Sequence, residues 1–276
     1  MPDILLVTPS QIPRRLHSVS EGYSLRPLTK QEATSLEDRL FRQGMPVELP
    51  RPSSVVSFPS VHIGHNSLNE YATLAEFALA LLTSEGHALV TFASAFSEAE
   101  CTRALPIPSP ASPPAPIAFP RRLTRIGTTQ WLRACHNAHR SATRKFEVTE
   151  SRFLRFLRGI DPGDSLLDLC ISLESLLTVQ TEIAFRFSVL LAHVPGDRGA
   201  LARDSSALLA DLYELRSKIV HGDPAASKVL ARLGPNQASL KDLARRILVA
   251  YVLFMSEHSS DQWGTHVRAI LFSQRG

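Results

Sequence analysis

Residues 165–178 read SLLDLCISLESLLT, and this segment is apolar on almost every side when it is drawn as a helix. Asp168 and Glu174 are its only charged residues. A helix without a polar face is typical of the interior of a helical unit, so the segment predicts a buried central helix. Residues 153–160 before it and 181–194 after it also read as helical segments.

A longer helical pattern follows. Leucine and isoleucine recur at helical spacing over residues 201–219 and predict a helix that ends near His221. Gly222 suits the left-handed residue that follows a helix, and Pro224 prevents the helix from continuing.

The rest of the C-terminal half fits the same interpretation. Residues 240–254 have one more helical pattern, and DPGD at 161–164 predicts a turn between two helices. Since no strand pattern interrupts this half, we expect residues 121–276 to form an all-α, up-and-down helical bundle.

The N-terminal part has a mixed pattern. Strand patterns occupy residues 4–9, 54–63 and 87–94. Thr29 followed by Glu32 forms a capping box that predicts a helix to about Arg42, and a second helix is expected to end near Ser84. Residues 1–103 are therefore predicted to be a small α/β domain, which makes the overall fold class α+β.

The segment that joins the two halves is rich in proline. Residues 104–120 read ALPIPSPASPPAPIAFP. Proline removes backbone donors and fixes φ, so neither a helix nor a central strand is expected here. We predict an extended linker that contains the domain boundary.

Composition bounds the class of protein. The chain of 276 residues is 44% hydrophobic, and its three cysteines are scattered without a metal-binding spacing. Its first residues lack the order of a signal peptide, and no apolar run reaches the length of a membrane span. We therefore expect a cytoplasmic protein without a metal or another cofactor.

Basic residues are concentrated in one segment. Residues 121–158 contain ten lysines and arginines but only two acids, a net charge of +8. Such a segment suits a polyanion such as RNA. A solvated helix face is the alternative interpretation.

The end of the long helix contains an Arg-x4-His motif, Arg216-Ser-Lys-Ile-Val-His221, within YELRSKIVHGD. Five residues of helix rotate by about 500°, which places the two side chains about 140° apart and about 7.5 Å apart along the axis. One rigid helix cannot aim both groups at a single atom. A twofold pairing of two such helices would gather two arginines and two histidines around one cleft.

Three sequence blocks, LLDLCISLESLL, TEIAFRFSVLLA and YELRSKIVHGD, occur in this order. In combination they resemble the HEPN superfamily, most closely its ApeA-like branch of bacterial defence systems. The resemblance covers residues 152–254. It implies a helical domain that dimerises and cleaves RNA without a metal.

The resemblance also assigns candidate site residues. Arg216 and His221 match the catalytic pair of the family, and Ser217 matches the polar residue after the arginine. Glu174 and Glu182 match acidic residues that are frequent there. Histidine transfers protons near neutral pH, while arginine grips phosphate oxygens. The expected function is thus a dimeric endoribonuclease in bacterial phage defence or a toxin-like system.

Other interpretations remain open. The domain could be a non-catalytic HEPN module for dimerisation or RNA binding, or the partner of a nucleotidyltransferase. The latter partners carry a tyrosine two residues after the histidine, where this chain has Asp223. The N-terminal domain is expected to sense a trigger or to restrain activity.

Two further motifs were weighed. His62-Ile-Gly-His65 spells the HIGH sequence of class I aminoacyl-tRNA synthetases, although only five lysines are present for the lysine-rich loop that such enzymes need. Cys135, His136 and His139 have the spacing of a partial metal site on one helix face, without a further ligand cluster.

Overall fold

A computed structural model describes the chain in segments. They are residues 3–8, 18–20, 22–42, 54–59, 68–82, 92–96, 101–106, 127–141, 144–177, 183–196 and 199–273. The chain divides into two compact units, residues 1–136 and 137–276, which we call unit 1 and unit 2. Helix α3 (Thr128–Ser141) begins in unit 1 and ends in unit 2.

Unit 1 is built on an antiparallel sheet. Its strands are β1 (Asp3–Thr8), β2 (Ser18–Ser20), β3 (Tyr23–Pro27), β4 (Ser54–Pro59), β5 (Phe92–Phe96) and β6 (Cys101–Pro106). Their order across the sheet is β2-β3-β4-β1-β5-β6. In the central pairs, Leu6 lies opposite Val56 on one side and Ala93 on the other. All the strand pairs are antiparallel, so unit 1 is of the α+β type, and the expectation of an α/β domain is wrong in that respect.

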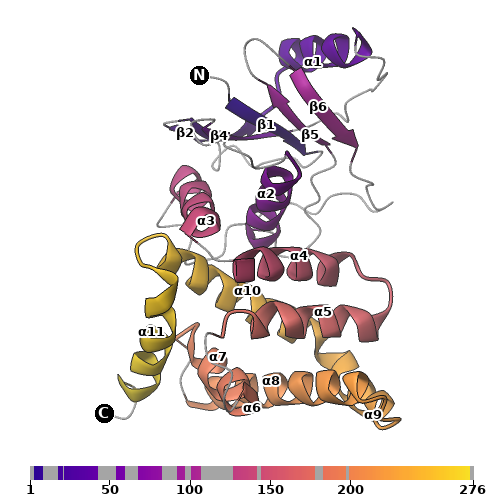
Figure 1. Cartoon of the computed structure of the whole chain (residues 1–276), viewed down its shortest axis with the longest axis vertical. Helices are drawn as coiled ribbons and strands as arrows, with labels where there is room; N and C mark the ends of the chain where they lie inside the picture. The colour runs from indigo at the N-terminus through magenta and orange to yellow at the C-terminus, as the bar shows by residue number, and fades with distance from the viewer. Residues whose placement is uncertain are drawn as a thin grey trace. The chain divides into compact units, whose positions relative to one another are not determined.

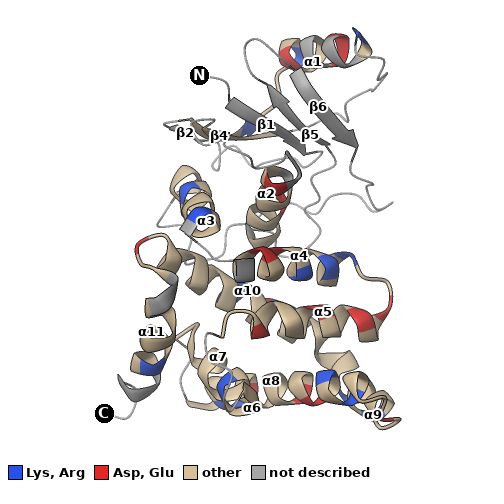
Figure 2. Ribbon diagram, in the orientation of Figure 1, with Lys and Arg blue, Asp and Glu red and all other residues tan. Residues whose placement is uncertain are grey.

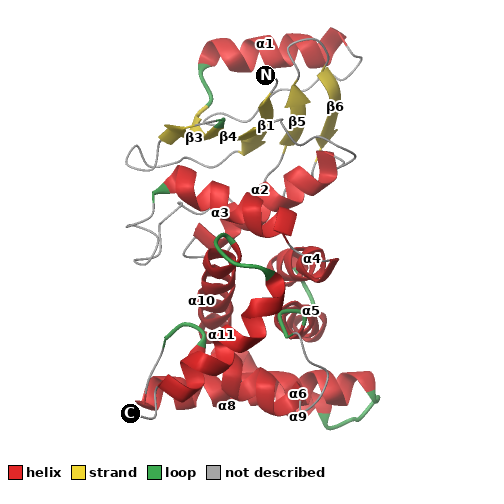
Figure 3. Cartoon of the chain, turned by 60° about the vertical axis from the view of Figure 1, so that its left-hand side comes forward, coloured by secondary structure: helices red, strands yellow, loops and turns green. Residues whose placement is uncertain are grey.

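Helices cover both faces of this sheet. Figures 1 and 3 show α1 (Lys30–Arg42) on one side and α2 (Leu68–Leu82) on the other. The consecutive residues Val55 and Val56 of β4 are both fully buried. Since successive side chains of a strand point to opposite faces, this burial requires a cover on each face.

The first turn of α1 is the predicted capping box. The Glu32 amide donates to Thr29 Oγ1 at 3.2 Å, and the Thr29 amide donates to a Glu32 carboxylate oxygen at 3.0 Å. Arg26 adds two hydrogen bonds to the same carboxylate, at 2.6 and 2.8 Å. Chiefly through the Arg26 hydrogen bonds, the pKa of Glu32 falls from 4.5 to about 2.

Glu32 should therefore make the stability of unit 1 depend on pH. Because its folded pKa is lowered, its stabilising contribution is complete above about pH 4.5 and is lost as the pH falls towards 2. We expect Glu32→Gln to lower the thermal unfolding temperature at pH 6 and to have little effect at pH 2. An equal loss at both pH values would contradict this role.

Sequence patterns located most of unit 1 correctly. The predicted strands at residues 4–9 and 54–63 correspond to β1 and β4, and the pattern at 87–94 overlaps β5. Strands β2, β3 and β6 were not predicted. Residues 104–106 of the predicted linker lie in β6, while 107–120 lie outside the described residues, so the linker and its domain boundary stay predictions.

In its described residues, unit 2 contains helices only. They are α4 (Arg144–Arg158), α5 (Pro162–Glu174), α6 (Ile183–Phe185), the π-helical segment η4 (Arg186–Leu190), α7 (Leu191–His193), α8 (Gly199–Val220), α9 (Ala226–Leu233), the 3₁₀ turn η5 (Gly234–Asn236), α10 (Gln237–Met255) and α11 (Ser260–Ser273). This agrees with the expected all-α region.

Helix α5 is the central element of unit 2. It packs against α4 on one side and α8 on the other (Figure 1). Its interior position follows from its apolar residues, of which Leu166, Leu169 and Leu173 are almost fully buried. This confirms a central helix for residues 165–174 of the predicted segment 165–178; the helix ends at Glu174, and residue 178 lies outside the described residues.

Two details of unit 2 differ from expectation. Asp161 caps α5 by accepting a hydrogen bond from the Asp164 amide, and Pro162 occupies the first turn, so most of the predicted DPGD turn is helical. In Figure 3, α4 and α5 are seen end-on, while α10 runs vertically in the picture. Unit 2 is therefore not a simple up-and-down bundle. No described helix is long and apolar enough to span a membrane.

Candidate functional site

The C-terminal end of α8 positions His221. The Asp223 amide donates to Lys218 O at 2.9 Å and the Gly222 amide to Ile219 O at 3.1 Å, the two hydrogen bonds of a Schellman motif. Gly222 has φ +66°, as the sequence predicts. His221 is thus the exposed residue that follows Val220, the last residue of α8, and its imidazole makes no hydrogen bond or ion pair with any described residue.

Asp223 and α9 hold this helix end in place. The Asp223 carboxylate accepts from the Ala225 amide at 2.8 Å and from Lys218 Nζ at 3.1 Å, and both contacts lower its pKa. On α9, Arg232 contacts Asp211 at 2.8 Å and Glu214 at 2.7 Å. His221 therefore projects from a corner whose backbone is fixed on both sides.

Arg216 lies one turn earlier and is paired with Glu174. Its Nε is 3.4 Å from a Glu174 carboxylate oxygen at the end of α5. The contact lacks the geometry of a hydrogen bond, because Arg216 Nε is buried without a hydrogen-bond partner. The Arg216 side chain is 31% exposed, so the rest of the guanidinium group can still reach an external anion.

Aromatic and apolar groups surround the Arg216–Glu174 pair. The Arg216 guanidinium carbon lies 5.9 Å from the ring centroid of Tyr213. The Tyr213 ring packs at 5.5 Å against Phe187, which is fully buried in η4. Cys170 lies about one turn before Glu174 on α5, and its burial raises the pKa of the thiol well above the ordinary value, with a smaller contribution from Glu174.

Two residues of α8 lie between the candidate pair. Helical rotation places Val220 about 40° and Ser217 about 100° from Arg216, within the arc of about 140° that ends at His221. Val220 is 58% exposed, although it is apolar, and Ser217 is half-buried. The candidate pair thus flanks a partly apolar strip at the exposed end of α8.

Part of the basic segment pairs with an acidic residue of α5. Arg152 and Arg155 of α4 contact the carboxylate of buried Asp168 at 2.6 and 3.2 Å. In Figure 2, basic stretches of α4 lie beside α5, whose ribbon carries acidic stretches. Arg152 and Arg155 therefore bind α5, which favours the interpretation as a structural helix face for this part of the segment.

His136 and His139, which have the spacing of a partial metal site, contact other residues. His136 is buried in unit 1, where its Nδ1 lies 2.8 Å from the Tyr23 hydroxyl. In unit 2, His139 Nδ1 lies 3.0 Å from a carboxylate oxygen of Glu150. The described residues contain no group of three or more His, Cys, Asp or Glu side chains suited to a metal ion.

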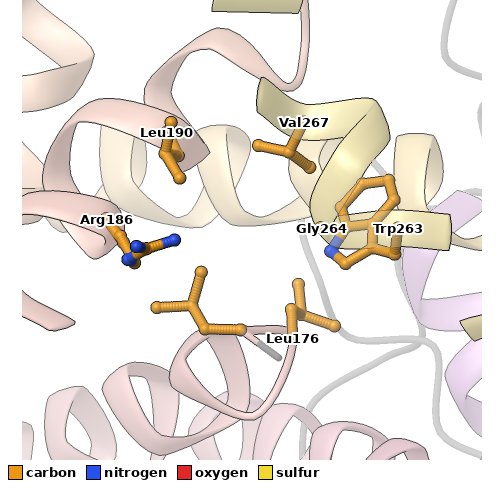
Figure 4. Close-up of a pocket in the computed structure, with 7 residues that line it drawn as sticks. Leu176, Arg186, Leu190, Trp263, Gly264 and Val267 are labelled. Carbon is orange, nitrogen blue, oxygen red and sulfur yellow. The ribbon is translucent and has the colours of Figure 1, made fainter. Parts of the chain in front are cut away.

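The pocket shown in Figure 4 is too small for a nucleotide. It is lined by Leu176, Leu177, Arg186, Leu190, Trp263, Gly264 and Val267. Its accessible volume is about 20 Å³, room for about one water molecule.

The structure brings together part of the predicted site. Glu174 and Arg216 are 42 positions apart in the sequence and form an ion pair. Glu182 and His62-Ile-Gly-His65 lie outside the described residues. Tyr213 and Cys170 were not predicted to lie at the site, although their spacing of three and four residues from Arg216 and Glu174 places each pair on one helix face.

Comparison with known proteins identifies no relative. No protein-family model matches the chain, and no curated protein or solved structure is significantly similar to it.

Proposed function

We propose that unit 2 is a metal-independent endoribonuclease of the HEPN type, with Arg216 and His221 as its catalytic pair. The observation that carries this proposal is the state of the two side chains. His221 is exposed at a fixed helix end without a described partner, and Arg216 keeps part of its guanidinium accessible beside Glu174. The ion pair also links two of the blocks that carry the HEPN resemblance.

The proposed chemistry requires these two groups and the RNA itself. The 2′-oxygen attacks the adjacent phosphorus, the bond from phosphorus to the 5′-oxygen breaks, and a 2′,3′-cyclic phosphate and a 5′-hydroxyl result. His221 transfers the proton that the 2′-hydroxyl loses or that the leaving 5′-oxygen gains. Arg216 stabilises the negative charge on the phosphate oxygens.

The proposed site needs two copies of the chain. Because Arg216 and His221 lie about 140° apart on α8, one copy presents them to different sides of the strip formed by Ser217 and Val220. A twofold pairing across this strip brings both pairs to one cleft and buries Val220. The role in defence or in a toxin-like system follows from the HEPN resemblance alone.

One observation favours a non-catalytic HEPN module as the second candidate. Arg216 lies 3.4 Å from the Glu174 carboxylate, as expected of an arginine that joins α5 to α8 for stability. In that case the helices serve dimerisation or RNA binding. The ends and the metal dependence of any RNA products distinguish the two candidates.

The test is incubation of the purified protein with tRNA and mRNA, with and without EDTA. We expect cleavage at the same rate in both conditions, because only Arg216, His221 and the RNA take part. The products should carry 5′-hydroxyl groups, which polynucleotide kinase labels without prior phosphatase treatment. Cleavage that stops in EDTA would contradict the proposal, and intact RNA in both conditions would favour the module.

A further inference from the structure

Tyr213 contacts the candidate catalytic arginine from the same helix. The two residues are three positions apart on α8, so their side chains share a face. The guanidinium carbon of Arg216 lies 5.9 Å from the centroid of the Tyr213 ring. A cation at this distance from an aromatic face is attracted by the ring, and an orientation of the guanidinium over the ring is favoured.

The Tyr213 ring packs against a second aromatic side chain. Phe187 packs against it with a centroid distance of 5.5 Å and an interplanar angle of 45°. Phe187 is fully buried in the π-helical segment η4, where the Leu191 amide donates to Arg186 O. The Tyr213 ring therefore rests on a buried side chain instead of moving freely at the surface.

Glu174 fixes the guanidinium from another direction. Its carboxylate lies 3.4 Å from Nε of Arg216, and the Arg216 side chain is 31% exposed. The carboxylate offsets the positive charge, while the Tyr213 ring attracts the guanidinium from 5.9 Å away. A group that is oriented before substrate arrives loses less freedom when it grips a phosphate.

We propose that Tyr213 is a positioning residue for Arg216, whose ring holds the guanidinium in the plane that binds the phosphate of the RNA. This inference rests on the proposed function for its catalytic consequence. The aromatic ring carries the effect, because the Tyr213 hydroxyl makes no hydrogen bond with any described residue. Tyr213→Phe is therefore the matched control for Tyr213→Leu.

The first readout is independent of activity. In the full chain, NMR records the Nε–Hε resonance of Arg216, assigned by its absence from Arg216→Lys. We expect Tyr213→Leu to shift this resonance, because the ring is lost, and Tyr213→Phe to leave it almost unchanged. If Tyr213→Leu fails to fold, Tyr213→Met supplies an unbranched apolar side chain without a ring for the same comparison.

The second readout is RNA cleavage. We expect Tyr213→Leu to lower kcat by about tenfold with a smaller change in KM, since the orientation of Arg216 matters most in the transition state. Tyr213→Phe should retain the wild-type rate.

The two proposals fail in different ways. Cleavage that depends on His221 but is unchanged in Tyr213→Leu overturns the positioning role and leaves the proposed function intact. If no His221-dependent cleavage exists, the proposed function fails and the NMR comparison decides the placement of Arg216. An unmoved Arg216 resonance in Tyr213→Leu overturns the inference in either case.

Discussion

Replacing His221 with alanine should lower the rate of RNA cleavage by about 10²–10⁴-fold, the usual contribution of a general acid or base. Arg216→Ala should have an effect of similar size, because a charged donor that stabilises the transition state contributes on that scale. Neither group can replace the other, since arginine does not release its proton at neutral pH. Initial rates on a labelled RNA measure both losses.

Loss of activity has meaning only if the variants fold. His221 is an exposed helix-terminal residue, so its replacement should cost at most about 1 kcal/mol of unfolding free energy. Arg203→Ala, an exposed arginine on the same helix, and His258→Ala, a histidine after α10, are matched controls that should cleave at the wild-type rate. Equal activity in His221→Ala and His258→Ala would remove His221 from the mechanism.

The second large effect is on stability. We expect His139→Ala to destabilise unit 2 by about 3 kcal/mol, because it leaves the Glu150 carboxylate buried without its imidazole partner. The Glu150 side chain is 1% exposed and that of His139 is 10% exposed, so water cannot readily replace the lost contact. Denaturant unfolding of the full chain, followed by circular dichroism, measures the change.

Arg140→Ala is the control for this prediction. Arg140 is the next residue on α3 and is exposed, so its replacement should change the unfolding free energy by less than about 0.5 kcal/mol. Combining His139→Ala with Glu150→Gln should cost less than the sum of the single changes, because the two side chains are in contact. Additive costs would show that the pair is not a stabilising unit.

The spacing of apolar residues predicted the C-terminal helices well, because a helix that packs in a core must place apolar side chains on its buried face. The apolar run at 165–178 has no face for solvent, so a central position was the only stable choice for it. The same reasoning assigned Asp168 no particular role, and the structure gives it two arginine partners from α4. Partners on other helices depend on tertiary packing, which a single segment does not encode.

Other features could not be predicted from the sequence for similar reasons. Short strands such as β2, with three residues, carry too few alternations to stand out from loops. Cys135, His136 and His139 have a plausible metal spacing on one helix, yet His136 contacts Tyr23 and His139 contacts Glu150. Local spacing shows which side chains share a helix face, but it does not show which distant residues they meet.

Glu174 was predicted as a site residue, but its contact was not. The HEPN resemblance indicated both Glu174 and Arg216 as candidate site residues, and the structure places the two in contact. Helix spacing alone would have identified Tyr213 and Cys170 as neighbours of these residues, had the site been extended by one turn in each helix. The exposure of Val220 could be seen only in the structure, because its position on the helix does not show whether another described element covers it.

The most direct test uses an RNA with a single unmodified ribonucleotide among 2′-O-methyl nucleotides, incubated with the protein in EDTA. We predict one cut, after the unmodified nucleotide, with a 2′,3′-cyclic phosphate and a 5′-hydroxyl as the new ends. No cut should appear with His221→Ala or with 2′-deoxyribose at that position. Cleavage at the deoxy position, or wild-type cleavage by His221→Ala, would contradict the proposed role of His221 in attack by the 2′-oxygen.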